Sequence, residues 1–187
     1  MGLSTYQLRK IEDIFEARSQ MKSRGLESTG YQKPAESWKI FELQRIDDNT
    51  YYFIPDISVR KKMNPALPKV HGPFLFVIMT ASPGQVFCGV DTVPVRARPE
   101  FYEPNNEMFE VGGHTSLSMR RDVLFAGEIL FNHGMLVKWT NESGHYAPEA
   151  DLIESNFLPH IQRLLPLDKF IDEHPTPRPV LPACWDI

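Results

Sequence analysis

The sequence has few cysteines, no long apolar run and no surplus of basic residues. Its 187 residues include two cysteines, Cys88 and Cys184, and carry a net charge of −4. A small secreted scaffold normally has more cysteine than this, so we expect two reduced, buried thiols. The longest apolar run, residues 73–79, is too short to span a membrane. No nucleic-acid partner is expected either, because phosphate contacts require clustered lysine and arginine.

The chain also lacks the apolar segment that a secretory signal peptide has near its N-terminus. We therefore expect a cytoplasmic protein, or one delivered into a target cell without a Sec signal. Residues 1–174 are predicted to form a single globular domain, since this length is typical of one hydrophobic core. Residues 175–187 are predicted to be an extended tail, because they contain prolines at positions 175, 177, 179 and 182.

Alternating apolar residues and turn residues predict a mostly antiparallel sheet. Residues 38–45 and 50–54 are predicted to pair as a hairpin around the polar turn 47–49. The clearest hairpin joins residues 123–131 to residues 135–140, and Gly134 can supply the positive φ of its turn.

One predicted strand differs from the others because it does not alternate. Residues 74–80, FLFVIMT, are apolar throughout, which predicts a strand buried on both faces. Residues 85–88 are expected to return beside it. Residues 91–110 contain three prolines and are predicted to be irregular.

Helices are predicted at both ends of the domain. Ser4 and Gln7 have the spacing of a capping box, and an amphipathic, basic helix is expected from there to Gly25. Pro148 is predicted to open a C-terminal helix that breaks at Pro159 and restarts beyond it. The expected fold class is therefore α+β: a mostly antiparallel sheet of hairpins with an N-terminal helix and one or two C-terminal helices.

Polar residues that could carry chemistry gather in three places, here called the polar islands: residues 112–116, 126–128 and 143–146. Glu128 interrupts an apolar strand, where an unpaired buried carboxylate would be very costly. Strand alternation places Glu128 on the face of Leu124, Ala126 and Leu130. If that face is the core, the side chains of the other two islands are its available partners.

The third island ends the clearest hairpin with Ser143, Gly144, His145 and Tyr146. We expect Gly144 to allow tight backbone geometry, and Pro148 to hold Ala147 extended. His145 and Tyr146 would then point in fixed directions. A histidine near a serine or a carboxylate can act in acid–base chemistry near neutral pH. The alternative is structural: the same residues can satisfy backbone groups at a turn.

Taken in order, these motifs resemble a segment of the plant IQ-motif calmodulin-binding (IQM) family. The segment also resembles the C-terminal domains of bacterial polymorphic toxins and related fungal proteins. The matching motifs are HTSL, AGE, NHG and SGHYAP, within about 80 residues of this chain. Thr115 and Leu117 stand where the family pattern has Ser and Phe. Residues 1–25 lack the Ile-Gln-x-x-x-Arg-Gly pattern of an IQ motif, so calmodulin is not an expected partner.

The resemblance to toxin domains implies an effector or toxin-like enzyme, and we expect it to act on NAD. The reaction would be an ADP-ribosyltransferase-like transfer or NAD hydrolysis, in which a glutamate stabilises the developing cation. This hypothesis gives catalytic roles to Glu128, His145 and His114. It gives NAD-binding roles to three further residues, Ser116, Tyr146 and Ser143.

The alternative function is a non-catalytic protein-binding module related to the IQM proteins. The cluster of histidine, tyrosine and glutamate would then be structural, and the N-terminal helix or the proline-rich tail would contact the partner. No metal is expected in either case, because the spacing of His114, Glu128 and His145 matches no standard zinc motif.

Overall fold

The computed structural model describes residues 25–28, 30, 32–55, 66–92 and 103–175. The predicted N-terminal helix and most of the predicted tail lie outside these residues, as does Cys184. Cys88 is fully buried as a free thiol, and burial raises its pKa above the ordinary range.

The described part of the chain is a mixed α+β fold built on one large sheet, in the order β2-β1-β4-β3-β6-β7-β8 with β5 beside β4. Every pairing is antiparallel except those of β5 with β4 and of β8 with β7. The prediction of a mostly antiparallel sheet is therefore confirmed. The strands are β1 (Phe41–Arg45), β2 (Tyr51–Pro55), β3 (Gly72–Met79), β4 (Phe87–Asp91), β5 (Glu110–Val111), β6 (Val123–Asn132), β7 (Met135–Thr140) and β8 (Phe170–Ile171).

The predicted strands lie close to their observed positions. The first hairpin is β1 and β2, although its first predicted residues form a 3₁₀ helix, η1 (Ser37–Lys39). β3 is almost entirely buried, and β4 returns beside it. In the turn between β6 and β7, His133 has φ 48° and Gly134 has φ 81°. Two successive positive φ values match the twist of a tight hairpin.

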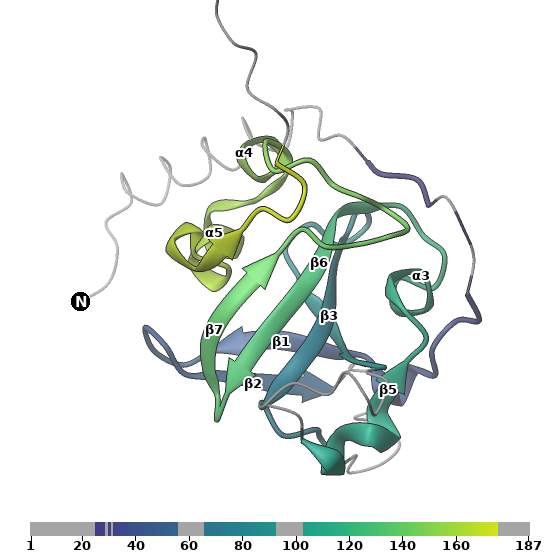
Figure 1. Cartoon of the computed structure of the whole chain (residues 1–187), viewed down its shortest axis with the longest axis vertical. Helices are drawn as coiled ribbons and strands as arrows, with labels where there is room; N and C mark the ends of the chain where they lie inside the picture. Colours follow the sequence, from purple (N-terminus) through teal and green to yellow (C-terminus); the bar gives the residue numbers. More distant parts are fainter. Residues whose placement is uncertain (1–24, 29, 31, 56–65, 93–102, 176–187) are drawn as a thin grey trace, which may run out of the picture.

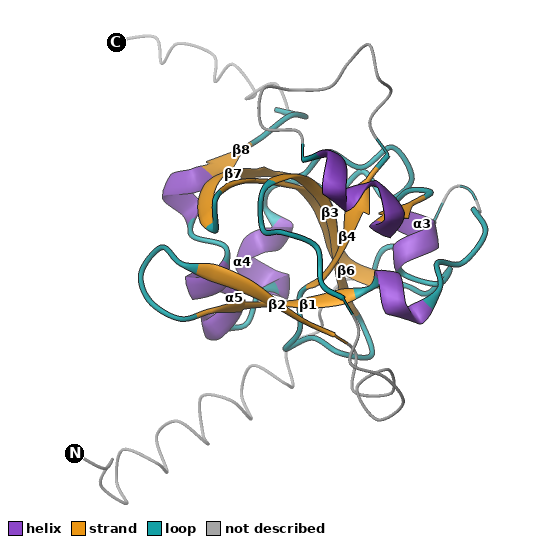
Figure 2. Cartoon of the chain, turned by 90° about the horizontal axis from the view of Figure 1, so that it is seen from below, coloured by secondary structure: helices purple, strands orange, loops and turns teal. Residues whose placement is uncertain are grey.

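The sheet is strongly curved, so that its two ends approach each other (Figure 2). The amide of Tyr51, at the start of β2, donates to the carbonyl of Gly134, in the turn just before β7, over 2.8 Å. Thr50 and Met135 form a further bridge. The concave side is lined by buried aromatic rings, including Phe76, Phe125 and Trp139. This inner cluster is the main hydrophobic core.

Two short C-terminal helices close one side of the inner cluster: α4 (Leu152–Asn156) and α5 (Pro159–Leu164), followed by η4 (Leu167–Lys169). Figure 1 shows them beside β6 and β7. Phe157 packs edge-on against Phe125, with ring centroids 5.0 Å apart. The predicted break at Pro159 is confirmed. No helix in the described ranges is both long and apolar enough to cross a membrane.

The prediction that Pro148 opens the first of these helices is wrong, because α4 begins at Leu152. The carbonyl of Pro148 instead accepts a hydrogen bond from Asn141 Nδ2 at 3.1 Å. The preceding residue, Ala147, has φ 39°, and its amide closes a turn onto the carbonyl of Ser143. These contacts hold Pro148 in a loop.

A smaller apolar cluster lies on the outer face of the sheet. It contains Leu75, Val77, Leu117, Ala126 and Tyr146, among other buried side chains. Two short elements help to cover this face, α3 (His114–Leu117) and β5, and the 3₁₀ helix η3 (Pro104–Phe109) precedes them. The outer cluster therefore contains one residue of the second island, Ala126, and one of the third, Tyr146, together with Val111 and Leu117, which flank the first island.

Gly127 gives the sharpest test of this packing. A Cβ at this position would collide with the Thr140 carbonyl oxygen and lie 2.9 Å from Phe76 Cε1. We expect Gly127→Ala to lower the free energy of unfolding by about 3 kcal/mol or more, since backbone must move to relieve the overlap. Gly144→Ala is the matched control, because a Cβ there would meet no atom within 4 Å. Equal urea denaturation midpoints for the two variants would contradict the assignment.

Candidate functional site

His114 occupies the first position of α3, where its ring is enclosed by the protein and 5% exposed. Its Nε2 lies 3.0 Å from the carbonyl oxygen of Gly127. A carbonyl can only accept, so Nε2 carries a proton. Burial lowers the pKa of His114 to about 4, against the opposing effect of this hydrogen bond. His114 therefore fastens α3 to β6.

The glycine before His114 is required by space and by backbone conformation. Gly113 has φ 126°, a conformation that side chains disfavour. A Cβ there would collide with the side-chain amide of Gln32. Gln32 also contacts Thr115: the backbone N–H of Gln32 donates to Thr115 Oγ1 over 3.1 Å. The first island is thus bound to a segment about 80 residues earlier in the chain.

Tyr146 forms a second fastening point, on the other side of α3. Its hydroxyl donates to the carbonyl of Arg121 at 2.9 Å. Because that hydroxyl has one proton, the Ser118 hydroxyl donates to Tyr146, with the two oxygens 2.7 Å apart. Ser118 is fully buried and Tyr146 is 5% exposed. The pair ties the end of the third island to the loop that follows α3.

The other predicted site residues lie close to these two fastening points. His145 is half-buried beside Gly30, and its charge contributes to the lowered pKa of His114. Ser116 is 2% exposed and its carbonyl accepts from the amide of Ala35. Ser143 is 1% exposed, and its Oγ has no hydrogen-bond partner among the described residues.

The expected backbone of the third island is partly wrong. Ala147 is in the left-handed region, with φ 39°, whereas Pro148 was expected to keep it extended. The turn from Ser143 to Ala147 imposes this conformation through the hydrogen bond between them. Gly144 has open space around it and no positive φ, so nothing in the structure explains a glycine there.

Sequence reasoning also missed Ser118 and Asn141. Asn141 is fully buried, and its amide donates to the Pro148 carbonyl and to Asp172, while its oxygen accepts from the Glu173 amide at 2.8 Å. An asparagine at the end of an apolar strand was the available signal for Asn141. Ser118 had none, because its partner lies 28 residues further along the chain.

Glu128 lies apart from the buried histidine and tyrosine. It alternates with the fully buried Ile129 along β6, so its side chain lies on the outer face. Glu128 shares this face with Ala126, as predicted. Leu124 is the exception to that prediction, since a register shift near Val123 turns it into the inner cluster.

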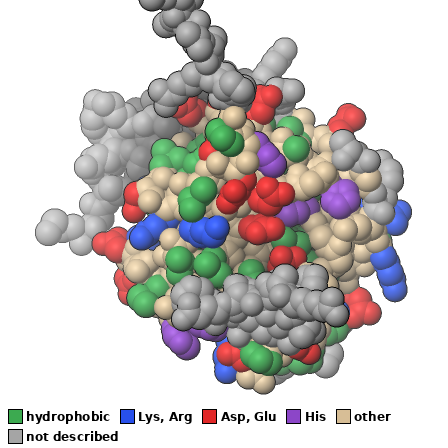
Figure 3. Space-filling view, viewed as in Figure 1, with side chains coloured by type: hydrophobic (Ala, Val, Ile, Leu, Met, Phe, Trp, Pro, Cys, Tyr) green, Lys and Arg blue, Asp and Glu red, His purple; other side chains and the backbone are tan. Residues whose placement is uncertain are grey.

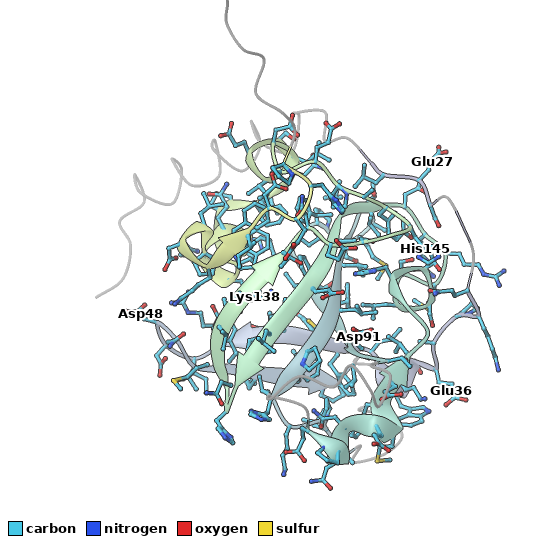
Figure 4. The ribbon with its side chains drawn as sticks, viewed as in Figure 1. Glu27, Glu36, Asp48, Asp91, Lys138 and His145 are labelled. Carbon is cyan, nitrogen blue, oxygen red and sulfur yellow. The ribbon has the colours of Figure 1, made fainter. Side chains whose placement is uncertain are left out.

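Other carboxylates surround Glu128 on this side of the sheet. Burial, and then the charges of Asp91, Glu142 and Glu173, raise the pKa of Glu128 to about 7. We call these four residues, Glu128 included, the acidic face. Figure 3 shows acidic side chains gathered near the middle of this view, and Figure 4 labels Asp91 and Lys138 near them.

One lysine and one histidine lie beside carboxylates of the acidic face. Lys138 Nζ lies 3.9 Å from Glu173, and His174 Nε2 lies 3.3 Å from Glu142. Such exposed pairs contribute little to stability. The side-chain carboxylate of Glu128 accepts no hydrogen bond from any residue in the described ranges. Over those same ranges, no group of three or more His, Cys, Asp or Glu side chains is placed to hold a metal ion.

We expect Tyr146→Phe to lower the free energy of unfolding by about 1–3 kcal/mol. The substitution leaves the buried Ser118 hydroxyl and the Arg121 carbonyl without their shared partner. Tyr52→Phe is the control, because Tyr52 is 38% exposed, and a change within about 0.5 kcal/mol is expected there. Urea denaturation followed by circular dichroism measures both variants. The network is not structural if Tyr146→Phe is as stable as the parent.

Titration of Glu128 is expected to lower the free energy of unfolding as the pH rises. Its pKa is higher in the fold, at about 7, than the value of 4.5 expected for the unfolded chain. The stabilising proton is therefore fully present below pH 4.5 and is lost as the pH passes 7.

Glu128→Gln should remove this part of the pH dependence. Relative to the parent, we expect the variant to gain about 1 kcal/mol between pH 5 and pH 8, a value reduced for solvent screening. Urea denaturation across this range gives the comparison. Parallel curves for the two proteins would show that Glu128 titrates alike in the folded and unfolded states.

Comparisons with protein-family models, curated proteins and solved structures found no match for this chain. The similarity to the plant IQM family and to toxin domains therefore depends on the short motifs alone. The functional roles it implies stay predictions.

Proposed function

We propose that this chain is a non-catalytic binding module whose acidic face receives a basic segment of a partner protein. The observation that carries the proposal is Glu128. Its carboxylate is partly withdrawn from water, stands among three other carboxylates and accepts no hydrogen bond from the described residues. A partner's lysine or arginine would relieve this repulsion and favour the ionised carboxylate.

The state of two other predicted site residues, the catalytic candidate His114 and the NAD-binding candidate Tyr146, supports a binding role. His114 is 5% exposed, and its Nε2 proton is engaged by Gly127. The Tyr146 hydroxyl is hydrogen-bonded to Ser118 and Arg121, and its ring is buried in the outer cluster. A group that stacks on nicotinamide or binds ribose needs a free surface. His114 instead fastens α3 to β6, and Tyr146 ties the third island to the loop after α3.

The surroundings of the acidic face favour a segment that is both basic and apolar. Val137 on β7 is 39% exposed, and Ile171 on β8 is 44% exposed. Figure 3 shows apolar side chains next to the acidic ones. Lysine or arginine would pair with the carboxylates while apolar residues cover these two side chains. An amphipathic basic segment meets both requirements.

Fluorescence anisotropy with a labelled amphipathic peptide of lysine and leucine tests the proposal. We expect binding that weakens at least about tenfold when NaCl rises from about 50 mM to about 500 mM, because exposed charges are screened. The double variant Glu128→Gln/Glu142→Gln should bind at least about tenfold more weakly than the parent. A peptide with glutamate in place of lysine should not bind.

The double variant Asp151→Asn/Glu154→Gln is the matched control, because it removes the same two charges from exposed positions in and beside α4. If the two double variants weakened peptide binding equally, the peptide would be attracted by net charge only. That result would overturn the assignment of binding to the acidic face. Isothermal titration with NAD, followed by a hydrolysis assay, tests the enzyme hypothesis. NAD consumption by the parent that Glu128→Gln abolishes would replace the binding role with a catalytic one.

A further inference from the structure

A pocket of about 400 Å³ lies on the outer face, and none of the predicted site residues lines it. Ile40, Met79 and Phe87 form part of its wall, and all three belong to the outer apolar cluster. Met119 lines it from the loop that follows α3. The volume is within the range of small-molecule sites, which combine an apolar wall with a few polar groups.

The pocket has a fixed negative group on one strand. Glu42, on β1, accepts from Gln44 Nε2 at 2.7 Å through one oxygen and from Gln85 Nε2 at 2.9 Å through the other. Both donors are neutral amides, so they orient the carboxylate without cancelling its charge. Gln85 also lines the pocket. The carboxylate therefore remains available to a cation.

The pocket also has a positive group, Arg121. Its guanidinium makes no ion pair or hydrogen bond with any described residue. The backbone of Arg121, by contrast, is held firmly: its amide donates to Ser118 at 3.2 Å and its carbonyl accepts from Tyr146 at 2.9 Å. Arg121 is exposed, and its guanidinium is available to an anion that enters the pocket.

The backbone leading to Arg121 is unusual. Met119 and Arg120 have φ of 54° and 63°, in the left-handed region that residues with side chains rarely adopt. The Arg120 amide donates to the Thr115 carbonyl at 3.0 Å, which secures this conformation. Strained backbone of this kind is found at functional sites, where the surrounding contacts enforce it. Here it places Met119 and Arg121 at the same pocket.

We propose that this pocket binds a free α-amino acid with an apolar side chain. The ligand carboxylate pairs with the Arg121 guanidinium, and the ligand ammonium pairs with Glu42. The apolar side chain lies against Ile40, Met79 and Phe87. Opposite charges on one pocket with an apolar wall match a zwitterion that carries an apolar group. Tyr146 acts as a positioning residue, because its hydroxyl holds the Arg121 backbone.

Thermal unfolding of the full chain with methionine, leucine or phenylalanine, each at about 10 mM, tests the proposal, since ligand binding to the folded state raises the melting temperature. Isothermal titration then gives the dissociation constant. We expect Arg121→Gln and Glu42→Gln each to weaken binding at least about tenfold. Arg120→Gln is the control: it changes the adjacent arginine, which does not line the pocket, and should leave affinity within about twofold.

Blocked ligands separate the two charge contacts. The N-acetyl amino acid should lose the contribution of Glu42, and the amino acid amide should lose that of Arg121. The proposal is overturned if none of the three amino acids shifts the melting temperature or gives heat, or if Arg121→Gln binds as well as the parent. Because neither substitution touches the acidic face, unchanged peptide binding by Arg121→Gln keeps this test separate from that of the proposed function.

Discussion

The structure depends on the close crossing of the end of β7 over Gly127. The Thr140 backbone approaches so near that no side chain fits at Gly127. At the same residue, the Gly127 carbonyl is available to His114, which fastens α3 onto β6. The motifs AGE and HTSL therefore meet at one backbone position, and SGHYAP begins just beyond the strand that crosses it. The backbone of the three polar islands is therefore close together, although the Glu128 side chain lies apart from His114 and Tyr146.

The two faces of the sheet differ at this crossing. On the concave face, aromatic rings from β3, β6 and β7 pack with α4 into the main core. Outward, α3 and Tyr146 cover part of the same strands, but Glu128 lies on the outer face outside that cover. A carboxylate left in this position is costly, since burial and like charges both disfavour ionisation. A cation from another molecule that approached Glu128 would lower this cost, whereas nothing within the described fold does so by a hydrogen bond.

Local patterns were enough to predict much of the fold. The three hairpins, the buried β3 and the break at Pro159 all follow from alternation and from proline or glycine positions. The failures came where contacts distant in sequence decide. Ala147 takes a positive φ because Ser143 and Asn141 shape the loop, against the preference that Pro148 imposes on its neighbour. Periodicity could indicate the face on which Glu128 lies, but not which carboxylates of β4 and of the later loops would surround it.

Tyr146 shows how one residue of the motif can serve both stability and function. Two consecutive left-handed residues other than glycine, Met119 and Arg120, cost on the order of 1–3 kcal/mol each. A solvent-exposed turn could avoid that cost with glycine. Instead, buried hydrogen bonds from Ser118 and Tyr146 offset it and hold the carbonyl of Arg121. A contact that stabilises an unfavourable backbone is best explained by where it places the neighbouring side chains, and here those of Met119 and Arg121 line the pocket between β1 and the loop after α3.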